Sequence, residues 1–162
     1  MHAICMQILW VVVHNPKAHE RWKELRIANR WAGAHRLLMG EGKKLAGARV
    51  LIVEDNFLIA EQLRRLVQDE GGQVVGPVAT SQRACALIRS GSLDGAFLDV
   101  SLQWKESIRA AQLLEERHVP FLVVSGHERE FISNRFPQVP YVSKPFCEES
   151  LVTLASRTFG TA

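Results

Sequence analysis

The chain has 162 residues, of which 47% are hydrophobic and 23% charged, a composition that predicts a packed domain and excludes a disordered chain. Its three cysteines are widely spaced, which excludes a disulfide framework or a zinc-ligand pattern and favours a reducing, cytoplasmic setting. The apolar run 8–13 is far shorter than the roughly 20 residues needed to span a bilayer, and it lacks the basic start of a signal peptide.

The charge is unevenly distributed along the chain. Residues 1–48 carry eight Lys or Arg against three Glu, a net charge of +5, whereas the remaining 114 residues have a net charge of −2. The overall charge of +3 and the isoelectric point near 9.0 therefore describe the first segment. They do not indicate nucleic-acid binding by the main domain.

The first 47 residues form a basic, Trp-containing N-terminal extension with a glycine-rich linker at its end, Gly40–Gly47. Trp22, Leu25 and Trp31 fall on one face of a predicted helix, with basic residues elsewhere. Such a helix is suited to a partner protein, a nucleic acid or an anionic membrane surface. The alternative is that residues 1–38 are not a native folded part, since Met39 precedes a segment resembling an ordinary domain start.

After the linker, short apolar runs alternate with segments of helical periodicity. The predicted strands are Val50–Val53, Val74–Val78, Ala96–Val100, Phe121–Val124 and Val139–Val142. The predicted helices contain apolar faces beginning at Phe57, Ala84, Ile108, Phe131 and Leu151. This alternation predicts an α/β domain with a doubly wound, five-stranded parallel sheet covered by helices on both faces.

In such a sheet, ligands bind beyond the carboxyl ends of the strands, near the point where strand order reverses. Polar residues follow four of the predicted strands: Glu54 and Asp55 after the first, Asp99 at the end of the third, Ser125 after the fourth and Lys144 after the fifth. If the strands are parallel, these residues meet at one edge of the sheet.

Three carboxylates at one edge repel one another, and a hard divalent cation such as magnesium relieves that repulsion through oxygen ligands. Lys144 supplies a positive charge, Ser125 a hydrogen-bond donor, and Asp99 is placed to be a nucleophile. These groups supply the alignment and the charge neutralisation that phosphoryl transfer requires.

Each residue also has a purely structural interpretation. Asp99 and Ser125 could cap helices, and Lys144 could be a solvated surface charge. For Asn56 the N-cap of the first helix is the preferred interpretation. The functional hypothesis depends on all four strand ends carrying the required groups together.

As a spaced set, Glu54-Asp55, Asp99, Ser125 and Lys144-Pro145 resemble the receiver domain of two-component response regulators, over residues 48–160. The resemblance implies a flavodoxin-like fold and a phosphoryl group accepted on Asp99. It implies magnesium held by Glu54, Asp55, Asp99 and the backbone carbonyl of Ser101.

The resemblance also assigns a switch and a special peptide bond. Ser125 would move toward the bound phosphoryl group, and Tyr141, three residues before Lys144, would swing inward with it. The bond between Lys144 and Pro145 would be cis, a state that X-Pro bonds reach at low cost.

The segment after Asp99 departs from the family pattern. The proline that many receivers carry there is absent, and Trp104 is unusual beside the site. The resemblance implies that Ser101 lies where side chains influence attack by water on the phosphorylated residue. These positions bear on the lifetime of the phosphorylated state. His127, close after Ser125, could face the site, but the preferred interpretation is a histidine at an exposed helix start.

Only 18 residues follow Lys144, so a C-terminal output domain is not expected. The hypothesis is a stand-alone cytoplasmic receiver, not an enzyme beyond its own magnesium-dependent phosphorylation and hydrolysis. Its partners would be a sensor histidine kinase or a histidine phosphotransfer protein and a downstream target protein, with a homodimer as a further form. No direct DNA binding is expected from the receiver.

Three alternatives remain open. A phosphatase of the haloacid dehalogenase type would need a second Asp at the position of Ser101. A flavodoxin-like flavin carrier would need a Ser/Thr/Gly-rich phosphate loop where the chain has Glu54-Asp55-Asn56-Phe57. The third is a receiver-like interaction module that is no longer phosphorylated.

Overall fold

The computed structural model describes residues 42–100, 104–126 and 134–161. One compact unit comprises Lys43–Ala162, and the chain before it, Met1–Gly42, forms a separate unit. The predicted basic extension therefore lies almost wholly outside the described residues. The short helix expected at Phe131 lies outside them as well.

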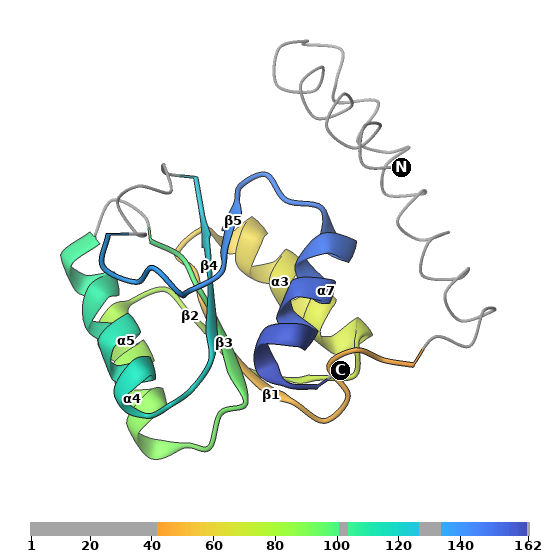
Figure 1. Cartoon of the computed structure of the whole chain (residues 1–162), viewed down its shortest axis with the longest axis horizontal. Helices are drawn as coiled ribbons and strands as arrows, with labels where there is room; N and C mark the ends of the chain where they lie inside the picture. Colours follow the sequence, from red (N-terminus) through yellow and green to blue (C-terminus); the bar gives the residue numbers. More distant parts are fainter. Residues whose placement is uncertain (1–41, 101–103, 127–133, 162) are drawn as a thin grey trace, which may run out of the picture. The chain divides into compact units, whose positions relative to one another are not determined.

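The sheet has five parallel strands in the order β2-β1-β3-β4-β5 (Figure 1). The strands are β1 (Arg49–Val53), β2 (Gln73–Val78), β3 (Gly95–Leu98), β4 (Phe121–Ser125) and β5 (Tyr141–Ser143). The chain leaves β1 to form β2 on one side and then returns to form β3 on the other. The predicted doubly wound parallel sheet is confirmed.

Helices cover both faces of this sheet (Figure 1). On one face lie α3 (Phe57–Asp69) and α7 (Glu148–Phe159), and on the other α4 (Ser81–Ser90) and α5 (Trp104–Glu116). In the described part of the chain, each helix is too short or too polar to span a membrane.

The apolar run of β1 serves both faces of the sheet. Val50 and Ile52 pack with α3 and α7, whereas Leu51 and Val53 pack with α4 and α5. This alternation follows from the two-residue repeat of a strand. Residues 50–53 of β1 are all buried, and burial on both faces of the sheet is why they appear in the sequence as an unbroken hydrophobic run, whereas Arg49 at the start is exposed.

The last strand begins two residues later than the predicted start at Val139. The Val139 N–H donates to the Phe136 carbonyl at 3.1 Å in a turn, and Pro140 has no N–H to donate. Parallel pairing with β4 starts at Tyr141, opposite Val123. Val139 still packs against the core as a partly buried residue, so its hydrophobicity reflects this contact from a turn rather than a strand.

The compact unit begins within Gly40–Gly47, the glycine-rich segment that was predicted to be a linker. Leu45 in this segment is fully buried, and its N–H donates to the Glu70 carbonyl at 3.1 Å. The Gly47 N–H donates to the Gly71 carbonyl at 2.9 Å. These contacts attach the segment to the end of α3, so the compact unit begins at Lys43.

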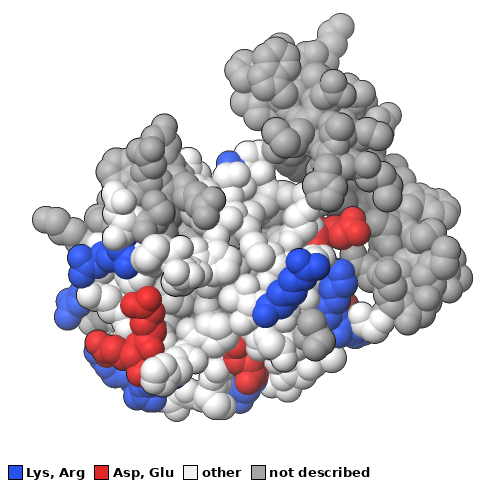
Figure 2. Space-filling view, viewed as in Figure 1, with Lys and Arg blue, Asp and Glu red and all other residues white. Residues whose placement is uncertain are grey.

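Charges of both signs occupy the described surface. On the face seen in Figure 2, separate groups of Lys and Arg lie with Asp and Glu between them. On α3, Glu61 pairs with Arg64 at 2.6 Å and with Arg65 at 2.8 Å. The hydrogen bonds from Arg64 and Arg65 lower the pKa of Glu61 to about 2. Exposed pairs of this kind contribute little to stability.

Gly95 at the start of β3 allows α7 to pack closely on the sheet. A Cβ atom there would lie 2.4 Å from the Phe159 ring. We expect Gly95→Ala to lower the free energy of unfolding by about 1–3 kcal/mol through overpacking, as measured by chemical denaturation. Gly91→Ala is the control, because its Cβ would meet the nearest atom at 3.4 Å. Equal losses in the two variants would contradict this explanation.

Candidate functional site

The strand order brings the ends of β1 and β3 together at the switch point of the sheet. Val53 pairs with Leu98, so Glu54 and Asp99 each follow one member of the same pair. The Asp99 N–H donates to the Val53 carbonyl at 2.9 Å, which continues the ladder for one residue beyond β3. Two acidic side chains from distant parts of the sequence are thereby placed side by side.

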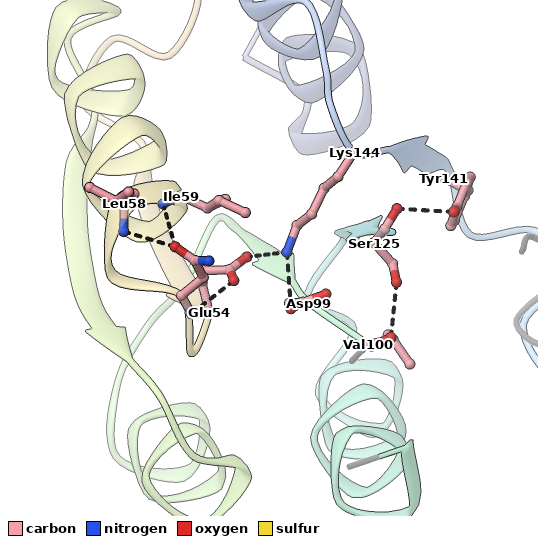
Figure 3. A network of polar contacts seen from close by, with 9 residues as sticks. Glu54, Leu58, Ile59, Asp99, Val100, Ser125, Tyr141 and Lys144 are labelled. Atoms are coloured by element: carbon pink, nitrogen blue, oxygen red, sulfur yellow. Dashed lines mark hydrogen bonds and ion pairs between the residues drawn. The ribbon is translucent and has the colours of Figure 1, made fainter. Parts of the chain in front are cut away.

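Glu54 is 3% exposed, and both of its carboxylate oxygens are hydrogen-bonded. Oε1 accepts from the Asn56 backbone N–H at 3.1 Å, and Oε2 accepts from Lys144 Nζ at 2.6 Å (Figure 3). Burial raises the pKa of Glu54, the hydrogen bond from Lys144 opposes that rise, and the nearby Asp99 charge adds to it. Glu54 is therefore a buried acid whose charge depends on its cationic neighbour.

Lys144 reaches this pair from the end of β5. Its Nζ lies 2.9 Å from Asp99 Oδ2 as well as 2.6 Å from Glu54 Oε2, and its side chain is 14% exposed. The backbone N–H of Lys144 donates to the Ser125 carbonyl at 2.9 Å, which fixes where the side chain starts. The peptide between Lys144 and Pro145 is cis. One ammonium group thus joins the two buried carboxylates.

The other oxygen of Asp99 has no such contact. Asp99 is 8% exposed, and its Oδ1 is buried without a hydrogen-bond partner among the described residues. A buried carboxylate oxygen without a partner is costly unless another group binds it. Asp99 therefore has one carboxylate oxygen, Oδ1, that can still bind another group.

The three acids also fit a magnesium ion. Glu54, Asp55 and Asp99 each offer an oxygen, and these oxygens lie within 4.8 Å of one another. Three carboxylates and one Lys leave a formal charge of −2 when all are ionised, which a divalent cation would cancel. Mg²⁺ prefers oxygen ligands and keeps several waters. Asp55 is exposed, which leaves the cluster accessible on one side.

Ser125 and Tyr141 lie on the β5 side of the acids (Figure 3). The Ser125 hydroxyl is fully buried and donates to the Val100 carbonyl at 2.9 Å. The Tyr141 hydroxyl donates to the Ser125 carbonyl at 3.1 Å. Burial raises the pKa of Tyr141, and the Asp99 charge adds to the rise. These two hydrogen bonds link Val100, the residue after Asp99, through Ser125 to Tyr141 on β5.

The predicted site residues from the strand ends are thus found at one edge of the sheet. Ser101, predicted to offer its carbonyl to the metal, lies outside the described residues, as does His127. Trp104 begins α5, and its side chain is not described. Asn56 caps α3 as expected, but its backbone contact to Glu54 was not predicted.

The family model of the response regulator receiver domain matches residues 50–156. Among curated proteins, the chain is 29% identical over 108 residues to the transcriptional regulatory protein PdtaR of Mycobacterium tuberculosis, covering 64% of this chain and 53% of the relative. It is 27% identical over 109 residues to the transcriptional regulatory protein YpdB of Escherichia coli, covering 65% and 44%. The chain therefore spans about half the length of these relatives.

Solved structures show the same fold. SdrG from Pseudomonas melonis, in its BeF3-activated conformation, is 33% identical, with a TM-score of 0.59 over 70% of this chain and 98% of that one. The receiver domain of a sensor histidine kinase from Pseudomonas aeruginosa, with a magnesium ion coordinated in its active site cleft, is 22% identical, with a TM-score of 0.60 over 71% and 99%. The match to the family model over most of the chain, together with this fold, shows that the chain belongs to the response regulator receiver domain family.

Proposed function

We propose that Asp99 accepts a phosphoryl group from a phosphohistidine of a sensor histidine kinase or a histidine phosphotransfer protein. The observation that carries the proposal is the state of its carboxylate. One oxygen is held by Lys144 at 2.9 Å, and the other is buried without a hydrogen-bond partner in the described part of the chain. A nucleophile needs such an oxygen, oriented but not fully engaged.

In this proposal Glu54, Asp55 and Asp99 hold magnesium, together with the Ser101 carbonyl. The support is the spacing of the three carboxylates and their excess negative charge. When bound, magnesium would neutralise charge on the phosphoryl oxygens and align the group with its acceptor. Lys144 Nζ lies 2.6 Å from Glu54 Oε2 and 2.9 Å from Asp99 Oδ2, so its positive charge offsets theirs and orients the Asp99 carboxylate.

The transfer itself needs little from the protein beyond alignment. An Asp99 oxygen forms a bond to phosphorus while the N–P bond of the donor's phosphohistidine breaks, and the donor keeps the electron pair on its imidazole. In a separate hydrolysis step, water attacks the phosphorus atom, the bond from phosphorus to the Asp99 oxygen breaks, and free Asp99 and inorganic phosphate result. The chain promotes both steps on itself, so we class it as a signalling protein and not as an enzyme acting on a separate substrate.

Ser125 and Tyr141 are the proposed switch. The Ser125 hydroxyl now donates to the Val100 carbonyl and would donate to a phosphoryl oxygen instead. The Tyr141 hydroxyl, which donates to the Ser125 carbonyl, would follow that movement. A few kcal/mol of differential interaction is enough to shift such a two-state equilibrium. The changed surface at β5 would then bind a target protein.

The signalling role is proposed to proceed by contacts between proteins in the cytoplasm. The receiver residues would bind the phosphodonor and a downstream target, and a homodimer is a further form to test. Direct DNA binding is not proposed for the receiver residues. Because the chain belongs to the receiver domain family, the phosphatase and flavin-carrier alternatives are dropped. The remaining alternative is an interaction module that is not phosphorylated.

The test is incubation of the full chain with magnesium and a small acyl or amido phosphate, followed by intact mass measurement. We expect one phosphoryl group on the wild type and none on Asp99→Asn. The matched control is Asp69→Asn, since Asp69 is exposed at the last turn of α3, away from the acid cluster. Asp69→Asn should be modified as the wild type is.

Two outcomes would contradict the proposal. Equal modification of Asp99→Asn would place the acceptor elsewhere. A wild type that stays unmodified and also fails to bind beryllofluoride would favour the unphosphorylated interaction module.

A further inference from the structure

The metal site and the start of α3 share one residue, Asn56. Its side-chain Oδ1 accepts hydrogen bonds from the backbone N–H groups of Leu58 at 3.0 Å and Ile59 at 3.3 Å. Its own backbone N–H donates to Glu54 Oε1 at 3.1 Å. The helix cap and a carboxylate of the acid cluster are therefore joined through a single residue, as Figure 3 shows for the contacts around Glu54, Leu58 and Ile59.

The side-chain cap restrains a helical turn whose first two side chains are exposed. Phe57 is 77% exposed and Leu58 76% exposed, so their side chains pack little against the domain. Ile59 is the first residue of the helix that packs against the core. The first turn also lacks acidic residues that would favour the positive end of the helix dipole. The Asn56 carbonyl also accepts a hydrogen bond from the Ala60 N–H at 2.9 Å, so the side-chain cap and this backbone bond together hold the turn at Asn56.

The cap also fixes the direction of the Asn56 N–H. The residue is held extended, with φ −80° and ψ 112°, as N-cap residues are. In this conformation its side chain faces the helix while its N–H faces Glu54. Glu54 then has one oxygen held by Asn56 and the other by Lys144 at 2.6 Å. Loss of the first contact would let the carboxylate rotate about the second.

We infer that Asn56 is a positioning residue for the metal site, which holds the Glu54 carboxylate in the orientation that binds magnesium. Partners that orient a metal ligand commonly change metal affinity by 10- to 100-fold when they are removed. The backbone N–H of residue 56 remains in every variant, and only the side-chain cap that fixes its direction is lost. We therefore expect an effect at the lower end of that range, about tenfold.

The experiment is a magnesium titration of the full chain by calorimetry, without any phosphodonor. Asn56→Ala should weaken magnesium binding about tenfold, and Asn56→Ser, which restores a capping oxygen, should bind close to the wild type. The matched control is Thr80→Ala. Thr80 caps α4 through the Arg83 N–H at 3.4 Å and has no hydrogen bond to the acid cluster among those described. It should lower the melting temperature by a few degrees, as Asn56→Ala does, without changing magnesium affinity.

A kinetic readout separates positioning from folding. With a small phosphodonor, Asn56→Ala should need about ten times more magnesium for the half-maximal rate, while the rate at saturating magnesium stays near that of the wild type. Unchanged magnesium affinity in Asn56→Ala, an equal loss in Thr80→Ala, or no rescue by Asn56→Ser would each overturn the inference.

The inference rests on the proposed function only in taking the acid cluster as a metal site. If the wild type binds magnesium but is never phosphorylated, the proposed function fails, and the calorimetric comparison still decides the role of Asn56. If the wild type binds no magnesium, the positioning role is overturned.

Discussion

Replacing Lys144 by Met should destabilise the metal-free protein by about 3 kcal/mol at neutral pH. Lys144 Nζ lies 2.6 Å from Glu54 Oε2 and 2.9 Å from Asp99 Oδ2, and both acids are largely buried. Met keeps much of the side-chain volume but removes the charge. Two neighbouring buried carboxylates then face each other without a cation. Chemical denaturation in the presence of a chelator measures the loss.

The pH dependence of that loss has a definite sign. Burial raises the pKa of Glu54 in the folded state, so the folded protein binds a proton more readily than the unfolded chain. A group of this kind costs no stability below its unfolded pKa, and the cost grows as pH rises through the folded pKa. Without Lys144 that cost increases. The deficit of Lys144→Met should therefore be small in acid and largest at neutral pH.

Lys44→Met is the matched control for this variant. Lys44 Nζ donates to the Thr153 hydroxyl at 3.0 Å, and its loss leaves no carboxylate unpaired at the acid cluster. We expect a loss below about 1 kcal/mol and little change with pH. Saturating magnesium should restore much of the stability of Lys144→Met, because a cation replaces the lost charge. A deficit independent of both pH and magnesium would contradict the assigned role of Lys144.

Magnesium should stabilise the wild type, and Asp55→Ala should abolish most of that effect. A ligand at 100 times its dissociation constant stabilises a folded protein by about 2.7 kcal/mol. Asp55 is exposed while Glu54 and Asp99 are buried, so its removal takes a ligand from the cluster without opening the core. We expect the metal-free melting temperature to stay close to that of the wild type. Thermal melts with and without magnesium, at constant ionic strength, measure the difference.

Asp69→Ala provides the comparison, since it removes an exposed carboxylate at the other end of α3. It should keep the full magnesium-dependent rise in melting temperature. If Asp55→Ala keeps the full rise as well, the acid cluster is not the site at which magnesium stabilises the protein.

The strand ends could be predicted from the sequence because they follow from topology. Parallel strands place their carboxyl ends at one edge, so Glu54, Asp99 and Lys144 meet although 90 residues separate the first from the last. Hydrophobic runs located the strands well enough for this argument. The orientation of each carboxylate depends on its hydrogen bonds and ion pairs in the folded structure, which a pattern of residues does not predict.

Three other features could not be predicted from the sequence, because they depend on tertiary packing or on backbone groups. Val139 looks like a strand residue because an apolar side chain that packs against the core gives the same signal from a turn as from a strand. Leu45 stands alone among glycines and lysines, and its burial results from contacts with the distant end of α3. The hydrogen bond from Asn56 to Glu54 uses a backbone N–H, which every residue except proline carries. Residue identity therefore gives no signal for it.

The central claim is that Asp99 is the residue that carries the phosphoryl group. The most direct measurement treats the full wild-type chain with magnesium and a small phosphodonor, digests it rapidly and maps the modification by peptide mass spectrometry. We predict a single modified peptide containing Asp99, with the group released by hydroxylamine as expected for an acyl phosphate. A stable phosphoryl group on a histidine or a hydroxyl residue, with Asp99 unmodified, would contradict the account.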